Sequence, residues 1–292
     1  MTRIITALSE ISDRYDALFV DLWGCVHDGV TALPEAVAAL QAYRRGGGTV
    51  VLVTNSPRPR ASVELQLDGF GVARDAWDVI ATSGDSARAA MYRGVVGRRV
   101  FYMGEAEETG FFAPLKFQHD PVEITRVPLD EAEGIVCLGP FDPMQNPEVL
   151  RPQLLLAKQK GLKLLCANPD IVVDRGERRE WCAGAVASLY TDMGGESLYF
   201  GKPHPPIYDL ARRRLSELGR EVPAEGILCI GDGIHTDVAG ALGEDYDSLF
   251  ITGGLAAAET GTGAGRGPDP ELLSRFTAER GTSPTYVIGK LR

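Results

Sequence analysis

Short apolar runs alternate with longer amphipathic segments along the chain, and this alternation predicts the secondary structure. The expected strands cover 17–21, 49–54, 78–82, 99–103, 134–138, 162–167, 197–200, 226–231, 248–252 and 285–289. The expected helices cover 33–45, 61–70, 85–93, 107–113, 147–160, 181–193, 205–218, 236–243 and 270–279. Strands that alternate with helices indicate an α/β fold, in which a parallel sheet has helices on both faces.

The middle of the chain has strands and helices of its own, and turn-like residues flank it at 82–84 and 175–177. We therefore predict a Rossmann-like parallel-sheet core that is discontinuous in sequence. Residues 1–83 and 181–292 form this core, and residues 84–180 form an inserted α/β domain.

The net charge indicates which partners the protein binds, and the cysteine content indicates the cellular compartment in which it works. A formal net charge of -10 argues against nucleic acid or an anionic membrane surface as the main partner. The five cysteines form no CxxC pair, which favours buried free thiols in a reducing compartment. The sequence has no signal-peptide pattern and no apolar run of about 20 residues, so we expect a cytoplasmic protein without a membrane span.

Polar residues follow several of the predicted core strands. Asp21 ends the first strand, Thr54 ends the second, Lys202 follows the strand at 197–200, and Asp232 follows the strand at 226–231, with Asp237 shortly after it. The carboxyl ends of parallel strands meet at one edge of a sheet, so these side chains are expected to converge there.

The residue types at this edge indicate phosphoryl chemistry. Asp21 and Asp232 offer the oxygen ligands that Mg²⁺ prefers. The hydroxyl of Thr54 can donate a hydrogen bond to a phosphoryl oxygen. Lys202 balances the negative charge and keeps Asp21 ionised, as an attacking carboxylate must be.

In this order the segments resemble the four motifs of the haloacid dehalogenase (HAD) superfamily. The motifs are Asp-x-x-Gly after a strand, a strand-terminal Thr-Asn, Gly-Lys-Pro, and Gly-Asp-Gly-Ile-His-Thr-Asp. With its long insert, Ala-Asn-Pro-Asp at 167–170 and Gly-Lys-Pro-His-Pro at 201–205, the chain is similar to class IIA, the NagD-like sugar- and nucleotide-phosphatase branch.

The resemblance implies a phosphatase that acts on a small phosphorylated metabolite, such as a sugar phosphate, a nucleotide or an aryl phosphate. Asp21 would attack phosphorus and form an aspartyl-phosphate. Thr54, Asn55 and Lys202 would hold the transferring group.

The resemblance also implies a Mg²⁺ site and a cap. Asp21, the backbone carbonyl of Trp23 and Asp232 would bind the ion, and Asp237 would support them. The inserted domain would cover the site, and caps of this size often meet a partner subunit in the family, which allows a homodimer through the cap.

Trp23 departs from the family pattern, because family phosphatases place an aspartate two residues after the nucleophile to protonate the leaving oxygen. Losing such a group costs about 10²–10⁴ in rate. The chain would then be a phosphatase with a slow leaving-group step, one that uses another acid, or a protein that transfers phosphoryl groups and hydrolyses slowly. His27 and His235 are candidate replacement acids, although a loop or capping role is the simpler interpretation of each.

Two further classes stay open at this point. One is a catalytically impaired protein that binds a phosphate ester or regulates through it. The other is a dehalogenase-type hydrolase, since hydrolytic dehalogenases of the superfamily lack the second aspartate and need no metal. Cys25 close to Asp21 would also suit a nucleophile, but no basic partner is evident in the sequence, which favours packing.

Overall fold

The computed structural model describes residues 2–105, 110–113, 120–175, 178–263, 265 and 267–292. The chain divides into two compact units. The first unit comprises Met1–Thr54, Glu64–Ala81 and Tyr208–Arg292, and the second comprises Asn55–Val63 and Thr82–Ile207. Among the described residues, no helix has both the length and the apolar character that a membrane crossing requires.

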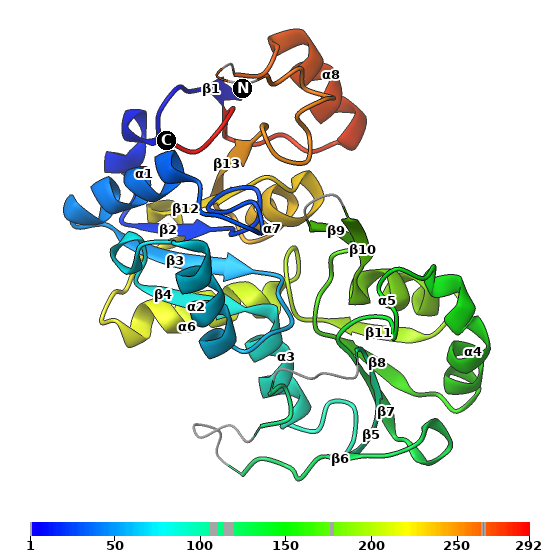
Figure 1. The fold of residues 1–292 in the computed structure, drawn as a ribbon. Helices are drawn as coiled ribbons and strands as arrows, with labels where there is room; N and C mark the ends of the chain where they lie inside the picture. Colours follow the sequence, from blue (N-terminus) through cyan, green and yellow to red (C-terminus); the bar gives the residue numbers. More distant parts are fainter. Residues whose placement is uncertain (1, 106–109, 114–119, 176–177, 264, 266) are drawn as a thin grey trace. The chain divides into compact units, whose positions relative to one another are not determined.

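The first unit is built on a seven-stranded sheet with the order β1-β14-β13-β12-β2-β3-β4 (Figure 1). Its strands are β1 (Arg3–Ile4), β2 (Ala17–Val20), β3 (Thr49–Thr54), β4 (Val79–Thr82), β12 (Ile227–Gly231), β13 (Asp247–Ile251) and β14 (Tyr286–Ile288). The pairs from β1 through to β3 are parallel. Every residue of β2, β3 and β12 is buried, which explains why these strands are apolar along almost their whole length.

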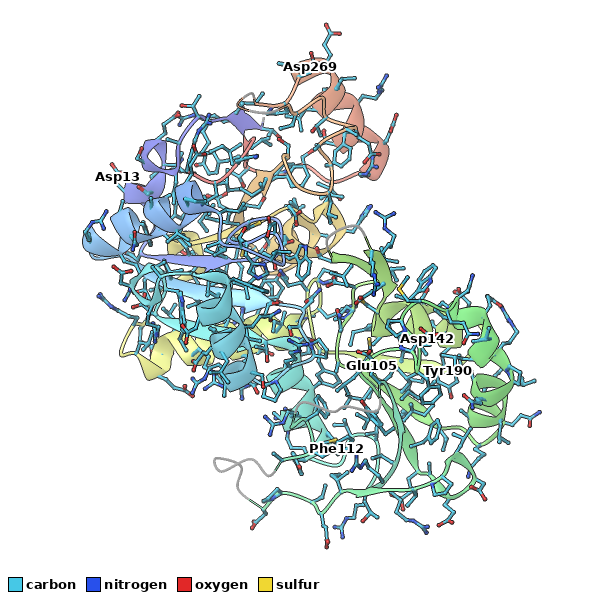
Figure 2. The ribbon with its side chains drawn as sticks, in the orientation of Figure 1. Asp13, Glu105, Phe112, Asp142, Tyr190 and Asp269 are labelled. Atoms are coloured by element: carbon cyan, nitrogen blue, oxygen red, sulfur yellow. The ribbon has the colours of Figure 1, made fainter. Side chains whose placement is uncertain are left out.

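Helices flank the strands of this sheet. They are α1 (Pro34–Arg45), α2 (Arg60–Phe70), α6 (Pro205–Glu217), the π-helical turn η7 (Ile234–Val238), α7 (Ala239–Gly243) and α8 (Pro270–Arg280). Asp269, which is labelled in Figure 2, directly precedes α8. Its side chain caps the helix, because its Oδ1 accepts hydrogen bonds from the N–H groups of Glu271 (2.9 Å) and Leu272 (3.0 Å). Leu273 and Phe276 of α8 then pack in one cluster with strand residues such as Phe250.

The second unit has a five-stranded parallel sheet with the order β11-β8-β7-β5-β6. Its strands are β5 (Arg99–Met103), β6 (Thr125–Arg126), β7 (Gly134–Cys137), β8 (Lys163–Cys166) and β11 (Glu196–Tyr199). Its helices are α3 (Ser83–Met91), α4 (Arg151–Gln159) and α5 (Ala183–Asp192), and α4 follows a 3-10 turn at Pro147–Leu150. A separate antiparallel pair joins β9 (Val172–Arg175) to β10 (Arg178–Trp181).

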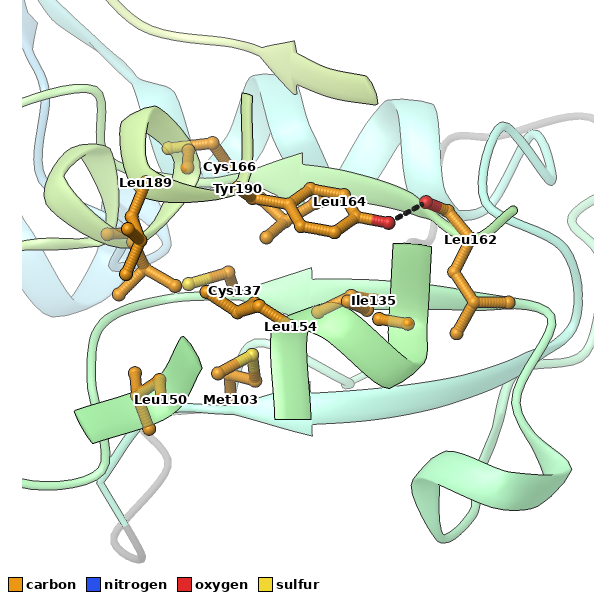
Figure 3. Close-up of a cluster of buried hydrophobic side chains, with 14 of the residues drawn as sticks. Met103, Ile135, Cys137, Leu150, Leu154, Leu162, Leu164, Cys166, Leu189 and Tyr190 are labelled. Atoms are coloured by element: carbon orange, nitrogen blue, oxygen red, sulfur yellow. Dashed lines mark hydrogen bonds between the residues drawn. The ribbon is translucent and has the colours of Figure 1, made fainter. Parts of the chain in front are cut away.

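Two apolar clusters hold the second unit together. One contains Leu154 of α4, Tyr190 of α5 and Ile135 of β7, and Figure 3 shows the Tyr190 hydroxyl donating a hydrogen bond to the Leu162 carbonyl (2.5 Å). The other contains side chains of α3 and strand residues such as Val136. Along each strand these residues alternate with those of the first cluster, so they point to the opposite face of the sheet. The sheet is therefore covered on both faces, as its near-continuous apolar strands require.

The parallel-sheet α/β class predicted from the sequence is confirmed, and each predicted strand corresponds to an observed one. Residues 110–113 form a turn and not the last part of the predicted helix at 107–113, and residues 107–109 of that helix lie outside the described residues. The predicted start of the second core segment at 181 also differs from the structure. Both α5 and β11 belong to the second unit, because β11 pairs with β8 in its sheet.

Candidate active site

The central strands of the first unit place three predicted site residues at one edge of its sheet. β2 lies between β12 and β3, with Val20 in register with Ile230 on one side and with Leu52 on the other. Asp21 follows β2 directly, and its N–H continues the ladder by donating to the Ile230 carbonyl (2.8 Å). Asp232 follows β12 and Thr54 ends β3, so both occupy the carboxyl ends of strands that neighbour β2.

Asp21 and Asp232 come close together in this arrangement. A carboxylate oxygen of each lies within 4.8 Å of the other and of the Cys25 sulfur. Both aspartates are buried, as is Thr54. Two adjacent carboxylates in a buried setting repel each other unless a cation lies near, so the pair has the electrostatics of a cation site.

Two glycines leave space around the Asp232 carboxylate. Gly24 has φ +74°, and a Cβ at either Gly24 or Gly254 would overlap the carboxylate of Asp232. The N–H of Leu255 donates to Asp232 Oδ2 (3.1 Å). The predicted site did not include this segment after β13, although the pair Gly253-Gly254 directly after a predicted core strand is a signal of close backbone approach.

Asp237 stabilises the turn that carries Asp232. Its Oδ2 accepts hydrogen bonds from the Gly233 N–H (3.1 Å) and from the Thr236 hydroxyl (3.2 Å). Among the described residues, Asp21, Cys25 and Asp232 form a cluster of three side chains that could hold a metal ion, and Asp237 is not part of this cluster. The supporting part that the family resemblance implies for Asp237 stays a prediction.

Trp23 lies in the loop between β2 and α1, where its indole is half-buried. The ring meets His27 edge to face, with 5.5 Å between ring centroids and 71° between planes. It also packs against Gly29. His27 in turn contacts the ring of Phe70, at 4.9 Å between centroids. The indole is thus held by neighbouring rings, and its N–H can donate a hydrogen bond but cannot act as an acid at neutral pH.

The two histidines proposed as replacement acids have different surroundings. Burial lowers the pKa of His27 to about 4, so the ring is neutral at physiological pH. Its Nδ1 accepts a hydrogen bond from the Gly29 N–H (3.0 Å), which leaves the proton on Nε2. His235 is exposed on the turn that carries Asp237. A neutral, buried His27 is a poor source of a proton, and its contacts make it a support for Trp23.

The remaining predicted site residues, Asn55 and Lys202, belong to the second unit and are hydrogen-bonded to each other. The Lys202 N–H donates to Asn55 Oδ1 (2.7 Å), and Asn55 Nδ2 donates to the Lys202 carbonyl (3.1 Å) and to Asp170 Oδ1 (2.8 Å). Both residues are buried. Asn55 therefore fixes the backbone at Lys202, and Asn55 itself follows Thr54 directly in the chain.

Buried aspartates after adjacent strands of a parallel sheet define this protein as an α/β enzyme with its site at the carboxyl edge of that sheet. Residues 18–118 match the haloacid dehalogenase-like hydrolase family, and residues 199–278 match a HAD-hydrolase-like family. A solved hydrolase of the haloacid dehalogenase-like family from Brucella suis 1330 is 40% identical, with a TM-score of 0.84 over 99% of this chain and 100% of that chain. The chain belongs to the haloacid dehalogenase-like hydrolases, which confirms the family that its motifs resemble.

Other similar proteins carry more specific descriptions. A dihydroxyacetone phosphatase from Corynebacterium glutamicum is 30% identical over 97 residues, which span 33% of this chain and only 34% of that relative. A solved glycerol phosphate phosphatase from Mycobacterium tuberculosis, in complex with calcium, is 23% identical with a TM-score of 0.63. That match covers 84% of this chain and 68% of the other, and at this identity it shows the shared fold.

Proposed function

We propose that this protein is a Mg²⁺-dependent phosphatase that acts on a small phosphorylated metabolite, with Asp21 as the nucleophile. The observation that carries the proposal is the buried pair of Asp21 and Asp232 at the carboxyl ends of adjacent strands. Membership of the haloacid dehalogenase-like hydrolases and the phosphatase names of several relatives favour a phosphate ester as the substrate.

The donor set suits a divalent cation. Asp21 and Asp232 would supply one carboxylate oxygen each, and the backbone carbonyl of Trp23 would supply a third oxygen. Asp237 would not bind the ion itself but would fix the turn that carries Asp232, through its hydrogen bond with the Gly233 N–H. A bound Mg²⁺ would neutralise charge on the phosphoryl oxygens, and the calcium in a relative supports a divalent ion at this fold.

The phosphoryl step requires one bond to form as another breaks. A carboxylate oxygen of Asp21 attacks phosphorus, the ester oxygen leaves with the bonding electrons, and an aspartyl-phosphate results. Thr54, Asn55 and Lys202 are proposed to hold the phosphoryl group during this transfer. Water then attacks the aspartyl-phosphate, which releases inorganic phosphate and restores the carboxylate of Asp21.

The residue at position 23 restricts the leaving group. An indole cannot protonate the departing oxygen, and the neutral His27 behind it is a weak substitute. We therefore assign to this site esters whose leaving group departs readily as an anion, such as aryl or acyl phosphates, in preference to alkyl phosphates. The second unit is assigned the role of a cap that sets the choice of substrate, and a homodimer would form through it.

A screen of phosphate esters tests the proposal, with turnover measured in Mg²⁺ and again in EDTA. We expect release of phosphate in Mg²⁺ only, and loss of release in Asp21→Asn, which should still unfold cooperatively on heating. Asp13→Asn, which alters an exposed aspartate on the same unit, is the matched control.

The alternatives give different results in the same assay. Release of halide from a haloacid in EDTA would identify a dehalogenase-type hydrolase. Tight binding of phosphate esters without turnover, in wild type and Asp21→Asn alike, would identify a regulatory binding protein.

A further inference from the structure

The site contains a third potential metal ligand of a different chemical kind. The Cys25 sulfur lies within 4.8 Å of carboxylate oxygens of both Asp21 and Asp232. All three residues are buried in the first unit. Sulfur is a soft ligand beside two hard ones, so the site is not composed for Mg²⁺ alone.

The loop after β2 brings Cys25 to this position. The Leu22 carbonyl accepts hydrogen bonds from the N–H groups of Cys25 (3.3 Å), Val26 (2.8 Å) and His27 (3.1 Å). The Gly24 N–H donates to the His27 carbonyl (2.9 Å). The chain therefore turns back on itself directly after Asp21, and this turn returns the Cys25 side chain to the end of the strand.

The spacing allows one ion to contact all three side chains. In a tetrahedral site, metal–sulfur bonds of about 2.3 Å and metal–oxygen bonds of about 2.1 Å place two ligands of one ion roughly 3.5 Å apart. Atoms that already lie within 4.8 Å of one another therefore need to approach by at most about 1.3 Å, which rotation of the side chains can supply. The space that Gly24 and Gly254 leave beside Asp232 permits such a shift.

We propose that thiophilic divalent cations such as Co²⁺, Zn²⁺ or Cd²⁺ bind this site through Cys25 together with Asp21 and Asp232, and more tightly than Mg²⁺ does. The inference rests on the metal site of the proposed function. Mg²⁺ would use the oxygen ligands alone. A thiophilic ion would form a metal–sulfur bond as the thiol proton passes to solvent.

Packing is the competing explanation, because buried cysteines often act as small apolar side chains. The other four cysteines are also buried and form no disulfide in the described structure. Among the described residues, however, only Cys25 lies in a cluster with carboxylates that could hold an ion. Substitution of one of the other four cysteines is therefore the control, because it removes a thiol that packs in the core without removing one from the carboxylate cluster.

Titration of the metal-free full-length protein with Co²⁺ tests the inference. A sulfur-to-cobalt charge-transfer band in the near ultraviolet reports a thiolate ligand, whereas calorimetry reports binding of any kind. We expect the band in wild type and in Cys229→Ser, and its loss in Cys25→Ser. Cadmium affinity should fall by at least about tenfold in Cys25→Ser while Mg²⁺ affinity stays unchanged.

The outcomes separate this inference from the proposed function. Calorimetric binding of Co²⁺ without the band in wild type would overturn the role of Cys25 and leave a carboxylate metal site standing. Binding of neither Co²⁺ nor Mg²⁺ would overturn the metal site itself. Cys25→Ala, checked by circular dichroism and thermal unfolding, repeats the test in case the serine variant does not fold.

Discussion

Replacement of Trp23 by aspartate is the most informative perturbation of this site. The substitution would place a carboxyl group two residues after Asp21, where family phosphatases keep their acid. If the wild-type enzyme lacks this group, Trp23→Asp should accelerate hydrolysis of esters with poor leaving groups. Trp23→Asn is the matched control, because it removes the same indole and adds an amide of nearly the same shape that cannot transfer a proton.

Trp23→Asp is expected to gain rate from the new acid and to lose stability from the missing indole, and the two effects can be compared as free energies. A positioned acid contributes about 10²–10⁴ in rate, which corresponds to roughly 3–5 kcal/mol of activation free energy. The edge-to-face contact of the indole with His27 contributes about 0.5–1.5 kcal/mol to folding. Because the indole is only half-buried, the whole loss should stay below the 3–5 kcal/mol or so typical of truncating a buried tryptophan. Both variants should therefore fold, and removal of the indole should lower the free energy of unfolding by a similar amount in each.

The assay is kcat/KM in Mg²⁺ for a series of phenyl phosphates of graded leaving-group pKa and for one alkyl phosphate. Wild type should slow steeply as the leaving-group pKa rises. Trp23→Asp should flatten this dependence and gain most on the alkyl ester, by up to about 10²–10⁴ over Trp23→Asn. Equal rates for the Asp and Asn variants on the alkyl ester would refute the reasoning, as would a flat dependence in wild type.

Three further expectations concern stability and binding. Burial lowers the pKa of His27 to about 4 from its ordinary 6.5, so the unfolded chain takes up a proton first as the pH falls. Urea unfolding should therefore show stability lost between about pH 6.5 and 4, by roughly 3 kcal/mol, and His27→Gln should reduce this loss. Gly254→Ala should weaken Mg²⁺ binding at least about tenfold by calorimetry, because its Cβ would overlap the site, whereas Gly69→Ala meets open space and should not. Tyr208 has a buried hydroxyl without a hydrogen-bond partner in the described part of the chain, so thermal unfolding should show Tyr208→Phe neutral or stabilising, whereas Tyr190→Phe should cost about 1–3 kcal/mol.

The predicted elements agree with the structure where burial sets the pattern. Strands such as β3 and β12 are buried throughout, so their apolar runs were visible without any knowledge of their neighbours. The pair β9 and β10 was not predicted, because these strands carry many charged residues and, within the described part of the chain, pair with each other alone. Strand β11 was predicted at 197–200 but assigned to the core, since its pairing with β8 depends on residues distant in sequence.

The sequence by itself determined the order of the buried strands, the family, and Asp21 and Asp232 as a candidate pair, because apolar runs and the short motifs that follow them carry this information locally. Only the tertiary structure decided what surrounds them. It placed Cys25 beside both aspartates, brought Gly254 against Asp232 from another strand, and buried His27 as a neutral ring behind Trp23. The approach of Gly254 and the contact of His27 with Phe70 join segments far apart in the chain, whereas Cys25 reaches the aspartates through a local turn whose course the residue pattern does not specify.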